Sequence, residues 1–421
     1  MSSGLLSYDE AAAMVAAHAA KLRCNRPAER VPLGQAQGRV LAQPLLADTD
    51  QPPFARSTRD GYACRAAEAS AHVQLALAGA TRAGQPPAGP LPPGAAWEIM
   101  TGAPVPSGAD AVMMLEHVET ANGHVRLLPP RRLAAGENIV AQGAQGRAGD
   151  EVLAAGAVMG FAQLALAASC GYAQVDVFPR PRVAILSTGD EIVPVESVPS
   201  AGQIRNSNGP MLAALVAAAG GDPWVLPIAG DTVDALDAAL VQAAEADLLL
   251  ITGGVSAGKF DLVEPALLRR GARFHFTGVR MQPGKPVVFG EISRSGTELD
   301  QNLCPAQRCC LGLPGNPVSS AVTFLLFAAP VLRALSGCLD RGPRFALARL
   351  AAEVKGKAGL TRFLPALCTF VAKTGELPEV ARVTWQGSGD IGAMARSNCF
   401  LVLPEEAEVL RAGEIVRILL A

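Results

Sequence analysis

A glycine-rich segment, TGGVSAGKFD (252–261), offers the residue types that bind a phosphate or a similar oxyanion. Its glycines let the backbone approach an anion closely, and Ser256 adds a hydroxyl group. The glycine spacing before Lys259 nearly matches a P-loop, but Phe260 stands where that motif needs a magnesium-binding Ser or Thr. The segment therefore favours an anion-binding loop over a P-loop nucleotide hydrolase. A purely structural glycine turn is the alternative.

Four carboxylates lie in loops that, like the glycine-rich segment, are expected to follow strands. Asp190 and Glu191 belong to the segment STGDE, Asp231 follows WVLPIAG, and Asp261 ends the glycine-rich segment. Two hard carboxylates facing a phosphate-binding loop suit magnesium better than zinc, which makes Asp231 and Asp261 the candidate metal ligands. The alternative for Asp231 is that it caps the helix expected to begin near Thr232.

Other polar residues stand in rigid turns. Lys285 lies between prolines in MQPGKP, where it is either an oxyanion clamp or an ordinary solvated lysine. Asn316 in GLPGNPVSS is either a ligand-binding residue or one that adopts an unusual backbone conformation. Asp60 in STRDGYA and Thr101 in IMTGAPVP are ordinary turn residues when each is considered alone.

The elements that must position these loops begin at Arg182. Strand-like runs (183–187, 224–228 and 247–252) alternate with helix-like runs (209–221 and 232–246). This alternation predicts a parallel sheet with helices on both faces. Ligands of such sheets bind beyond the carboxyl ends of the strands, and the acidic and glycine-rich loops are predicted to lie at that edge.

The rest of the chain predicts β-rich modules and short helices. Short apolar runs between Gly/Pro clusters over 73–149 indicate a small β module. The sequence after Gly337 again shows short runs typical of strands. Ser7 and Glu10 have the spacing of a capping box at the start of an amphipathic helix. A further helix is expected over 159–169, ended by Gly171.

Composition narrows the class of protein. The 421 residues carry a formal charge of −2 without a basic stripe, which argues against binding to nucleic acid. The uncharged stretch 311–332 is broken by Pro and Gly near its start, so a buried helix is expected instead of a membrane span.

The nine cysteines are an odd number scattered along the chain, which does not suggest a disulfide framework. Cys304, Cys309 and Cys310 cluster, but no Cys-x-x-Cys pair and no His nearby in the sequence supports zinc. Thiols in a surface insertion over 303–310 are therefore expected.

Taken in order, DGYA, MTGAPVP, STGDE, TGGVSAG, PGKP and GLPGNPVS resemble the signature blocks of the MoeA / gephyrin E-domain family over nearly the whole chain. The resemblance implies an elongated subunit of four parts that forms a homodimer. Its fold is multi-domain α/β plus β, with a MogA-like parallel α/β domain, a β-rich inserted domain and a C-terminal β-barrel-like domain. The implied domains are an N-terminal linker and dimer domain (1–47 with 147–180), the β-rich inserted domain (48–146), the MogA-like molybdopterin-binding domain (181–336) and the C-terminal domain (337–421).

The same resemblance implies an activity in molybdenum-cofactor biosynthesis. The expected reaction is the Mg²⁺-dependent insertion of molybdate into adenylylated molybdopterin with release of AMP, in the cytoplasm. A MogA-like adenylyltransferase and molybdoenzymes or their chaperones are the implied partners, and neither nucleic acid nor a membrane is expected.

Site residues carry over by position. Asp231 and Asp261 would hold magnesium, Lys285 and Ser388 would contact molybdate, and two residues of the partner subunit would close the site. The implied catalytic residues are Asp60, Thr101, Glu191, Asp231, Asp261, Lys285 and Ser388, of which Asp60 and Thr101 come from the partner. The implied substrate-binding residues are Thr188, Gly189, Asp190, Gly253, Gly254, Ser256, Gly258, Pro314 and Asn316.

The chain departs from the family pattern at three polar positions. Gln282 stands where many members have a lysine, Pro365 where Phe-x-Arg is frequent, and Gln145 where an aspartate is usual. Arg362 or Arg280 is a candidate replacement for the arginine charge that is missing at Pro365. The alternative function is that of a catalytically weakened paralogue that binds and delivers molybdopterin or the finished cofactor.

Overall fold

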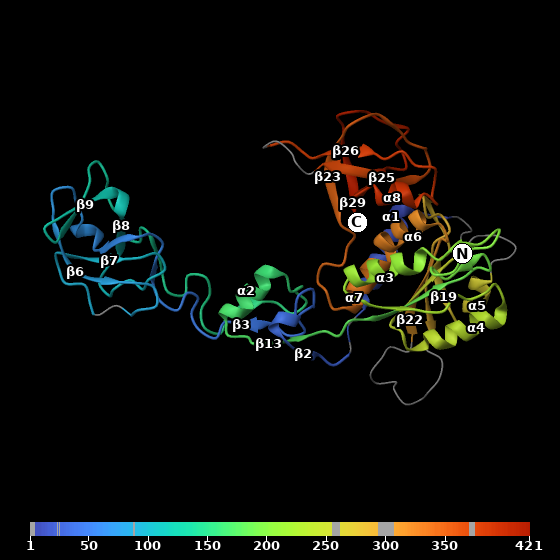
Figure 1. Cartoon of the computed structure of the whole chain (residues 1–421), viewed down its shortest axis with the longest axis horizontal. Coiled ribbons are helices and arrows are strands. Elements are labelled where there is room, and N and C mark those ends of the chain that lie inside the picture. Colours follow the sequence, from blue (N-terminus) through green and yellow to red (C-terminus); the bar gives the residue numbers. More distant parts are fainter. Residues whose placement is uncertain are drawn as a thin grey trace.

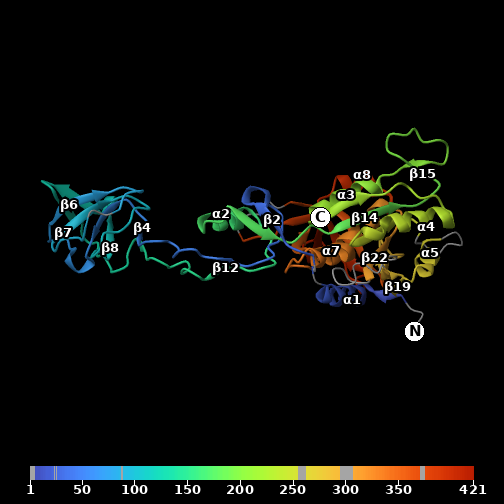
Figure 2. The ribbon, with the colours of Figure 1, turned by 90° about the horizontal axis from the view of Figure 1, so that it is seen from below.

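The computed structural model describes residues 5–22, 24, 26–86, 89–254, 262–293, 307–369 and 375–421. The subunit is elongated (Figure 1). A β module lies at one end, a slender connecting part follows, and the α/β domain and the carboxy-terminal domain lie together at the other end. Figure 2 shows the same separation from a second direction.

The distal module is a single six-stranded sheet in the order β8-β5-β7-β6-β10-β9. All neighbouring strands are antiparallel except β6 and β7, which run parallel. The sheet confirms the β module expected from the short apolar runs. Its strands are β5 (Gly61–Cys64), β6 (Leu75–Thr81), β7 (Ala95–Ile99), β8 (Ala111–Met114), β9 (Val118–Ala121) and β10 (His124–Leu127).

The connecting part consists of two-stranded ribbons and helix α2 (Phe161–Ser169), which the sequence predicted within two residues. Gly171 follows this helix with a φ of 78°, a left-handed conformation that glycine adopts without steric cost. The ribbons are β2 (Glu29–Pro32) with β13 (Gln174–Val177), β3 (Leu45–Leu46) with β12 (Glu151–Leu153), and β4 (Arg56–Ser57) with β11 (Ile139–Val140).

The α/β domain is built on a six-stranded sheet in the order β17-β14-β18-β22-β21-β19. Its first four strands are parallel, as predicted, while β21 and β19 extend the sheet in the antiparallel sense. The strands are β14 (Arg182–Ser187), β17 (Asp222–Val225), β18 (Leu248–Thr252), β19 (Arg273–Phe276), β21 (Val288–Ser293) and β22 (Gln307–Leu313).

Helices cover both faces of this sheet. Helix α3 (Asn208–Ala218) and helix α6 (Pro317–Thr323) bury apolar side chains in the core on one face. Helix α4 (Val233–Gln242) and helix α5 (Val263–Arg269) do so on the other. The two cores hold the carboxyl ends of the parallel strands in place.

Helix α1 (Tyr8–Lys21) begins with the predicted capping box, in which Ser7 and Glu10 each accept a backbone N–H of the other. The predicted boundaries group this helix with the connecting part. In the structure it packs on the α/β domain, where Tyr8 contacts the ring of Phe327, and Tyr8 also contacts Phe363 in the carboxy-terminal domain. Burial of its apolar face against that larger core is the physical reason.

A continuous helical stretch, Pro317–Leu335, is long and apolar enough to cross a membrane by length and composition, and 83% of its most apolar part is buried within the protein. It comprises α6, a π-helical segment (Phe324–Ala328) and α7 (Ala329–Leu335). The stretch is thus a helix of the protein core, as predicted from the Pro and Gly residues near the start of the uncharged segment 311–332.

The carboxy-terminal domain closes into a ring of five strands, β25-β26-β23-β29-β27, in which β27 pairs back onto β25. A β-barrel-like ending was predicted. A further strand, β20 (Val279–Gln282), pairs with both β25 and β1 (Leu6–Ser7) and so joins this domain to the α/β unit. The ring strands are β23 (Phe345–Leu350), β25 (Thr361–Thr369), β26 (Glu379–Arg382), β27 (Cys399–Leu403) and β29 (Ile415–Leu420).

The cysteines expected in a surface insertion are placed differently. Cys309 and Cys310 belong to β22 and are buried on its two faces, one in each core of the α/β domain. This corrects the prediction, because β22 is an inner strand between β18 and β21 and its successive side chains point to opposite faces. Cys304 lies outside the described residues.

Candidate active site

A cavity of about 270 Å³ lies where the parallel strands β14, β18 and β22 end. The loops after these three strands supply most of its wall, as the parallel-sheet prediction requires. The cavity collects predicted site residues from segments far apart in the sequence. Its lining is Thr188, Gly189, Glu191, Asp231, Gly253, Gly254, Pro286, Pro314, Gly315 and Asn316.

The hydroxyl of Thr188 is the most distinctive polar group of the cavity. The residue is only 4% exposed, and its Oγ1 has no hydrogen-bond partner within the described part of the chain. A buried hydroxyl without a partner costs free energy, so such groups are rare in folded proteins. A polar ligand in the cavity would supply the missing partner.

Two glycines of the β18 loop pack directly against Thr188. Gly253 has a φ of 95°, and a Cβ at that position would lie 2.5 Å from the Thr188 carbonyl oxygen. A Cβ at Gly254 would lie 2.7 Å from the side chain of Val263. Both positions therefore require glycine for backbone conformation and for space.

The carboxylates in and beside the cavity have different roles. The Asp190 side chain accepts a hydrogen bond from the backbone N–H of Asp231 (3.0 Å) and so holds the Asp231 loop. Thr232, and not Asp231, caps helix α4 by accepting from Ala235 N–H (3.3 Å). The capping alternative for Asp231 is wrong, because the side chain one residue later performs that role. Within the described residues, neither Asp231 nor Glu191 forms a salt bridge.

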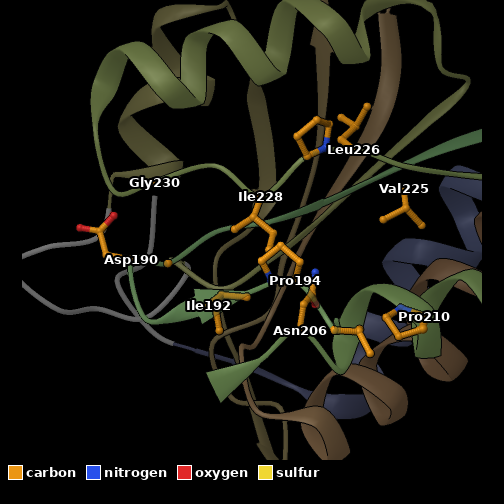
Figure 3. Close-up of a pocket in the computed structure, with 12 residues that line it drawn as sticks. Asp190, Ile192, Pro194, Asn206, Pro210, Val225, Leu226, Ile228 and Gly230 are labelled. Carbon is orange, nitrogen blue, oxygen red and sulfur yellow. The ribbon is translucent and has the colours of Figure 1, made fainter. Parts of the chain in front are cut away.

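A second pocket of about 590 Å³ lies beside the first and shares Gly189 with it. Asp190 lies at one end, and apolar side chains including Ile192, Pro194 and Ile228 form much of the remaining wall (Figure 3). The predicted substrate-binding residue Asp190 therefore borders this neighbouring pocket, and the two pockets together offer a polar and a more apolar compartment.

A buried hydrogen-bond network, which the sequence did not reveal, supports the Pro314–Gly315 turn that lines the cavity. The Asn208 side-chain amide donates to Thr252 Oγ1 (2.8 Å) and to the Gly315 carbonyl (2.7 Å). Ser320 donates to the Pro314 carbonyl (2.6 Å) and lies 3.2 Å from Thr252 Oγ1. The only signal in the sequence is a polar residue at the start of an otherwise apolar helix.

Ser388 and Lys285, the two predicted molybdate contacts, lie next to residues that line the cavity. The Ser388 carbonyl accepts the N–H of Val318 (3.1 Å) in the first turn of α6, next to Asn316. Lys285 is exposed and directly precedes Pro286, which lines the cavity. Asn316 has an ordinary extended φ of −69° and makes no capping bond, which excludes the unusual-backbone alternative.

Asp60 and Thr101 form a pair of their own. Thr101 donates to Asp60 Oδ1 through its backbone N–H (2.6 Å) and through its hydroxyl (2.7 Å), and both bonds lower the pKa of Asp60. Asp60 directly precedes β5 and Thr101 follows the end of β7, so the pair belongs to the distal module, which lies at the other end of the subunit from the α/β domain (Figure 1). The remaining predicted site residues, Ser256, Gly258 and Asp261, lie outside the described residues.

The two candidate replacements for the lost family charges differ in their surroundings. Arg280 is engaged by Glu405 Oε1 (3.1 Å) and by the Leu5 carbonyl (2.9 Å). Arg362 is the register partner of Gln282 across β25 and β20. Its guanidinium donates to the Lys355 carbonyl, while burial and then Arg382 lower its pKa. Arg362 is thus the residue opposite Gln282 on the adjacent strand, and its guanidinium contacts the Lys355 carbonyl.

The fold and the cavity define a multi-domain protein whose central α/β domain carries a polar ligand site at its strand ends. Three family models match successive parts of the chain. They are the MoeA N-terminal region (domains I and II) over 6–171, a probable molybdopterin-binding domain over 184–334, and the MoeA C-terminal region (domain IV) over 347–421.

Whole-length relatives agree with these matches. The chain is 34% identical to molybdopterin molybdenumtransferase of Nostoc sp., over 95% of this chain and 90% of that protein. It is 36% identical to molybdopterin molybdenumtransferase 2 of Mycobacterium tuberculosis, over 93% and 94%. The solved MoeA structure from Pyrococcus horikoshii OT3 aligns with a TM-score of 0.77 at 28% identity, over 99% of this chain and 100% of that one. The chain belongs to the MoeA family of molybdopterin molybdenumtransferases.

The contact between Gly253 and Thr188 gives a stability prediction. Gly253→Ala should destabilise the protein more than Gly202→Ala. Gly202 has a similar φ of 87°, but a Cβ added there would meet no described atom within 4 Å. Backbone strain costs both variants about 1–2 kcal/mol. The clash should add roughly 1–3 kcal/mol to the first alone. Equal shifts in melting temperature for the two variants would contradict the packing of the β18 loop on Thr188.

Proposed function

We propose that this protein inserts molybdate into adenylylated molybdopterin, in a magnesium-dependent reaction that releases AMP. The proposal rests on whole-length relatives named molybdopterin molybdenumtransferase and on one structural observation. That observation is the Thr188 hydroxyl, which is buried at the strand ends beside Gly253, Gly254, Glu191 and Asp231 and has no hydrogen-bond partner among the described residues. The protein would act in the cytoplasm, receive its substrate from a MogA-like adenylyltransferase, and pass the cofactor to molybdoenzymes or their chaperones.

The groups around the smaller cavity suit a phosphate. Thr188 can donate its hydroxyl, and Asn316 can donate a side-chain amide that no capping bond occupies. The absence of side chains at Gly253 and Gly254 leaves room for a bulky tetrahedral anion. These donors would orient the phosphoanhydride and stabilise charge as it develops during cleavage. The apolar compartment beside them suits a flat heterocycle.

The carboxylates fit magnesium by their chemistry. Asp231 and Glu191 present hard oxygen donors at the cavity and make no salt bridge among the described residues. Asp190 is engaged with the Asp231 backbone and so positions the loop. Asp231 would hold the ion together with Asp261, which lies outside the described residues. When bound, magnesium would neutralise phosphate charge.

Molybdate would bind at the rim of the cavity. It is a dianion, and Lys285 and the Ser388 hydroxyl are a cation and a donor near Pro286 and Asn316. Arg362, across from Gln282, adds a second cation in place of the lysine that many members carry. The retained carboxylates and this relocated charge favour an active transferase over a carrier.

A homodimer would complete the site. Asp60 is exposed, and its acceptor oxygen is oriented by two bonds from Thr101, yet the pair is remote from its own subunit's cavity. A second subunit placed beside the first would deliver this pair, since a two-fold interface supplies each site with the same residues.

A single-turnover assay tests the activity. Purified protein with adenylylated molybdopterin, magnesium and molybdate should release AMP, with a rate that molybdate raises and chelation of magnesium abolishes. Asp231→Asn should slow this release strongly while the melting temperature stays unchanged. Tight pterin binding without AMP release would favour the carrier function instead.

The Thr188 hydroxyl can be tested by separating stability from activity. Thr188→Val should leave the melting temperature equal or higher, because it removes an unsatisfied buried polar group. AMP release should fall roughly tenfold or more, since a hydrogen bond to a charged group contributes about 1.5–3 kcal/mol. The matched control is Thr252→Val, which should lower the melting temperature because Asn208 and Ser320 lose their partner. A Thr188→Val protein with full activity would remove the hydroxyl from the site.

Complementation between inactive variants tests the shared site. Asp60→Asn and Asp231→Asn homodimers should each be inactive. If the two residues come from different subunits, random mixing of equal amounts should restore roughly a quarter of the wild-type sites, because half the dimers are mixed and one of their two sites is intact. No recovery after verified subunit exchange would place both residues in the same subunit's site.

A further inference from the structure

A group of metal-ligating side chains lies on the sheet face that helix α1 covers. It consists of His18 from α1, His275 from β19 and Glu291 from β21. The ligand atoms of the three residues all lie within 4.8 Å of one another. His18 Nε2 is 3.6 Å from Glu291 Oε1, and His275 Nε2 is 3.7 Å from Glu291 Oε2.

Local structure explains why these side chains converge. The register of β19 and β21 shifts between Phe274 and Phe276, so His275 is an extra residue at a bulge. A bulge redirects the side chain it carries. His18 occupies the last turn of α1, and both imidazole rings pack against Phe289, with centroid distances of 5.2 and 5.0 Å. The two imidazole rings thereby lie next to each other, with centroids 5.1 Å apart, and each approaches the Glu291 carboxylate.

The separations fit shared coordination better than direct hydrogen bonding. Charge-assisted hydrogen bonds between such groups measure about 2.7–2.9 Å. Both His–Glu separations, at 3.6 and 3.7 Å, are too long for that. Nitrogen and oxygen ligands of one tetrahedral zinc ion, each about 2.0–2.1 Å from the metal, lie about 3.3–3.4 Å apart. Small side-chain rotations would close the difference.

Burial supports a ligand at this position. The His18, His275 and Glu291 side chains are 14, 26 and 23% exposed. His275 Nε2 is itself buried and has no hydrogen-bond partner among the described residues.

We propose that His18, His275 and Glu291 form a binding site for a divalent transition metal of the zinc class. Two imidazoles and one carboxylate suit zinc, whereas magnesium and calcium prefer oxygen ligands throughout. The partial exposure leaves a fourth coordination position for water. The metal would tie the carboxyl end of α1 to strands β19 and β21.

This site is distinct from the candidate active site. Glu291 pairs with Cys309, which lies four residues before Leu313 on β22. At about 3.3 Å per residue, the two positions are roughly 13 Å apart along the strand. The inference uses none of the residues assigned to the transferase reaction and stands without that assignment.

Cys309 is the other potential metal ligand next to the proposed set. Its Sγ lies 3.3 Å from His18 Nε2, and burial raises the pKa of its thiol. The sulfur is not within 4.8 Å of all three ligand atoms, so we assign it to a contact with His18 and not to the ligand set.

Metal titration of the full-length protein tests the site. After treatment with a chelator, the wild type should bind one equivalent of zinc, retain it through desalting and melt at a higher temperature, while magnesium should produce none of these effects. His275→Gln and Glu291→Gln should each weaken zinc binding at least tenfold and lose the shift in melting temperature. His18→Gln, on a different element, should do the same.

Two controls make the result decisive. His124→Gln changes an exposed histidine of the distal module and should bind zinc as the wild type does. Cys309→Ser should also retain the zinc. Failure of the wild type to bind zinc, unchanged binding in all three ligand variants, or loss of zinc in Cys309→Ser alone would overturn the proposal.

Discussion

Parallel pairing of β14, β18 and β22 is the constraint on which the candidate active site depends. Because parallel strands end at the same edge of a sheet, their loops meet although helices and further strands separate them in the sequence. Thr188, Gly253 and Pro314 follow these strands and share one cavity. The apolar cores on both faces hold the strands in register, so the position of the site is a consequence of core packing.

Around that edge, polar groups divide into those satisfied by the protein and those left for a ligand. Asn208, Thr252 and Ser320 bond to one another and to the Pro314–Gly315 turn, which makes the floor rigid. The Asn208 side-chain oxygen and the Thr188 hydroxyl have no such partner among the described residues, and of the two residues Thr188 lines the cavity. A rigid floor beneath an unsatisfied donor is a preorganised site, since little reorganisation is needed when an anion binds.

The same sheet carries two sites of different chemistry. Its carboxyl edge gathers oxygen donors and glycines, whereas the face beneath α1 gathers imidazoles around Glu291. The first arises from loops after parallel strands, and the second from a bulge, an antiparallel strand and a helix that begins the chain. Hard cations and anions suit one set of groups and a borderline metal suits the other.

The sequence by itself determined the kinds of element and the loops that follow the strands, because hydrophobic periodicity, glycines and caps are local signals. It therefore predicted the α/β domain, the β modules and the position of Glu191 and Asp231 in one crevice, whereas Asn316 was assigned to the site only through the family resemblance. Only the tertiary structure decided that Cys309 is buried, that His18 meets His275, and that Arg362 stands opposite Gln282. Those contacts depend on strand order and helix docking between distant segments, which no local pattern specifies.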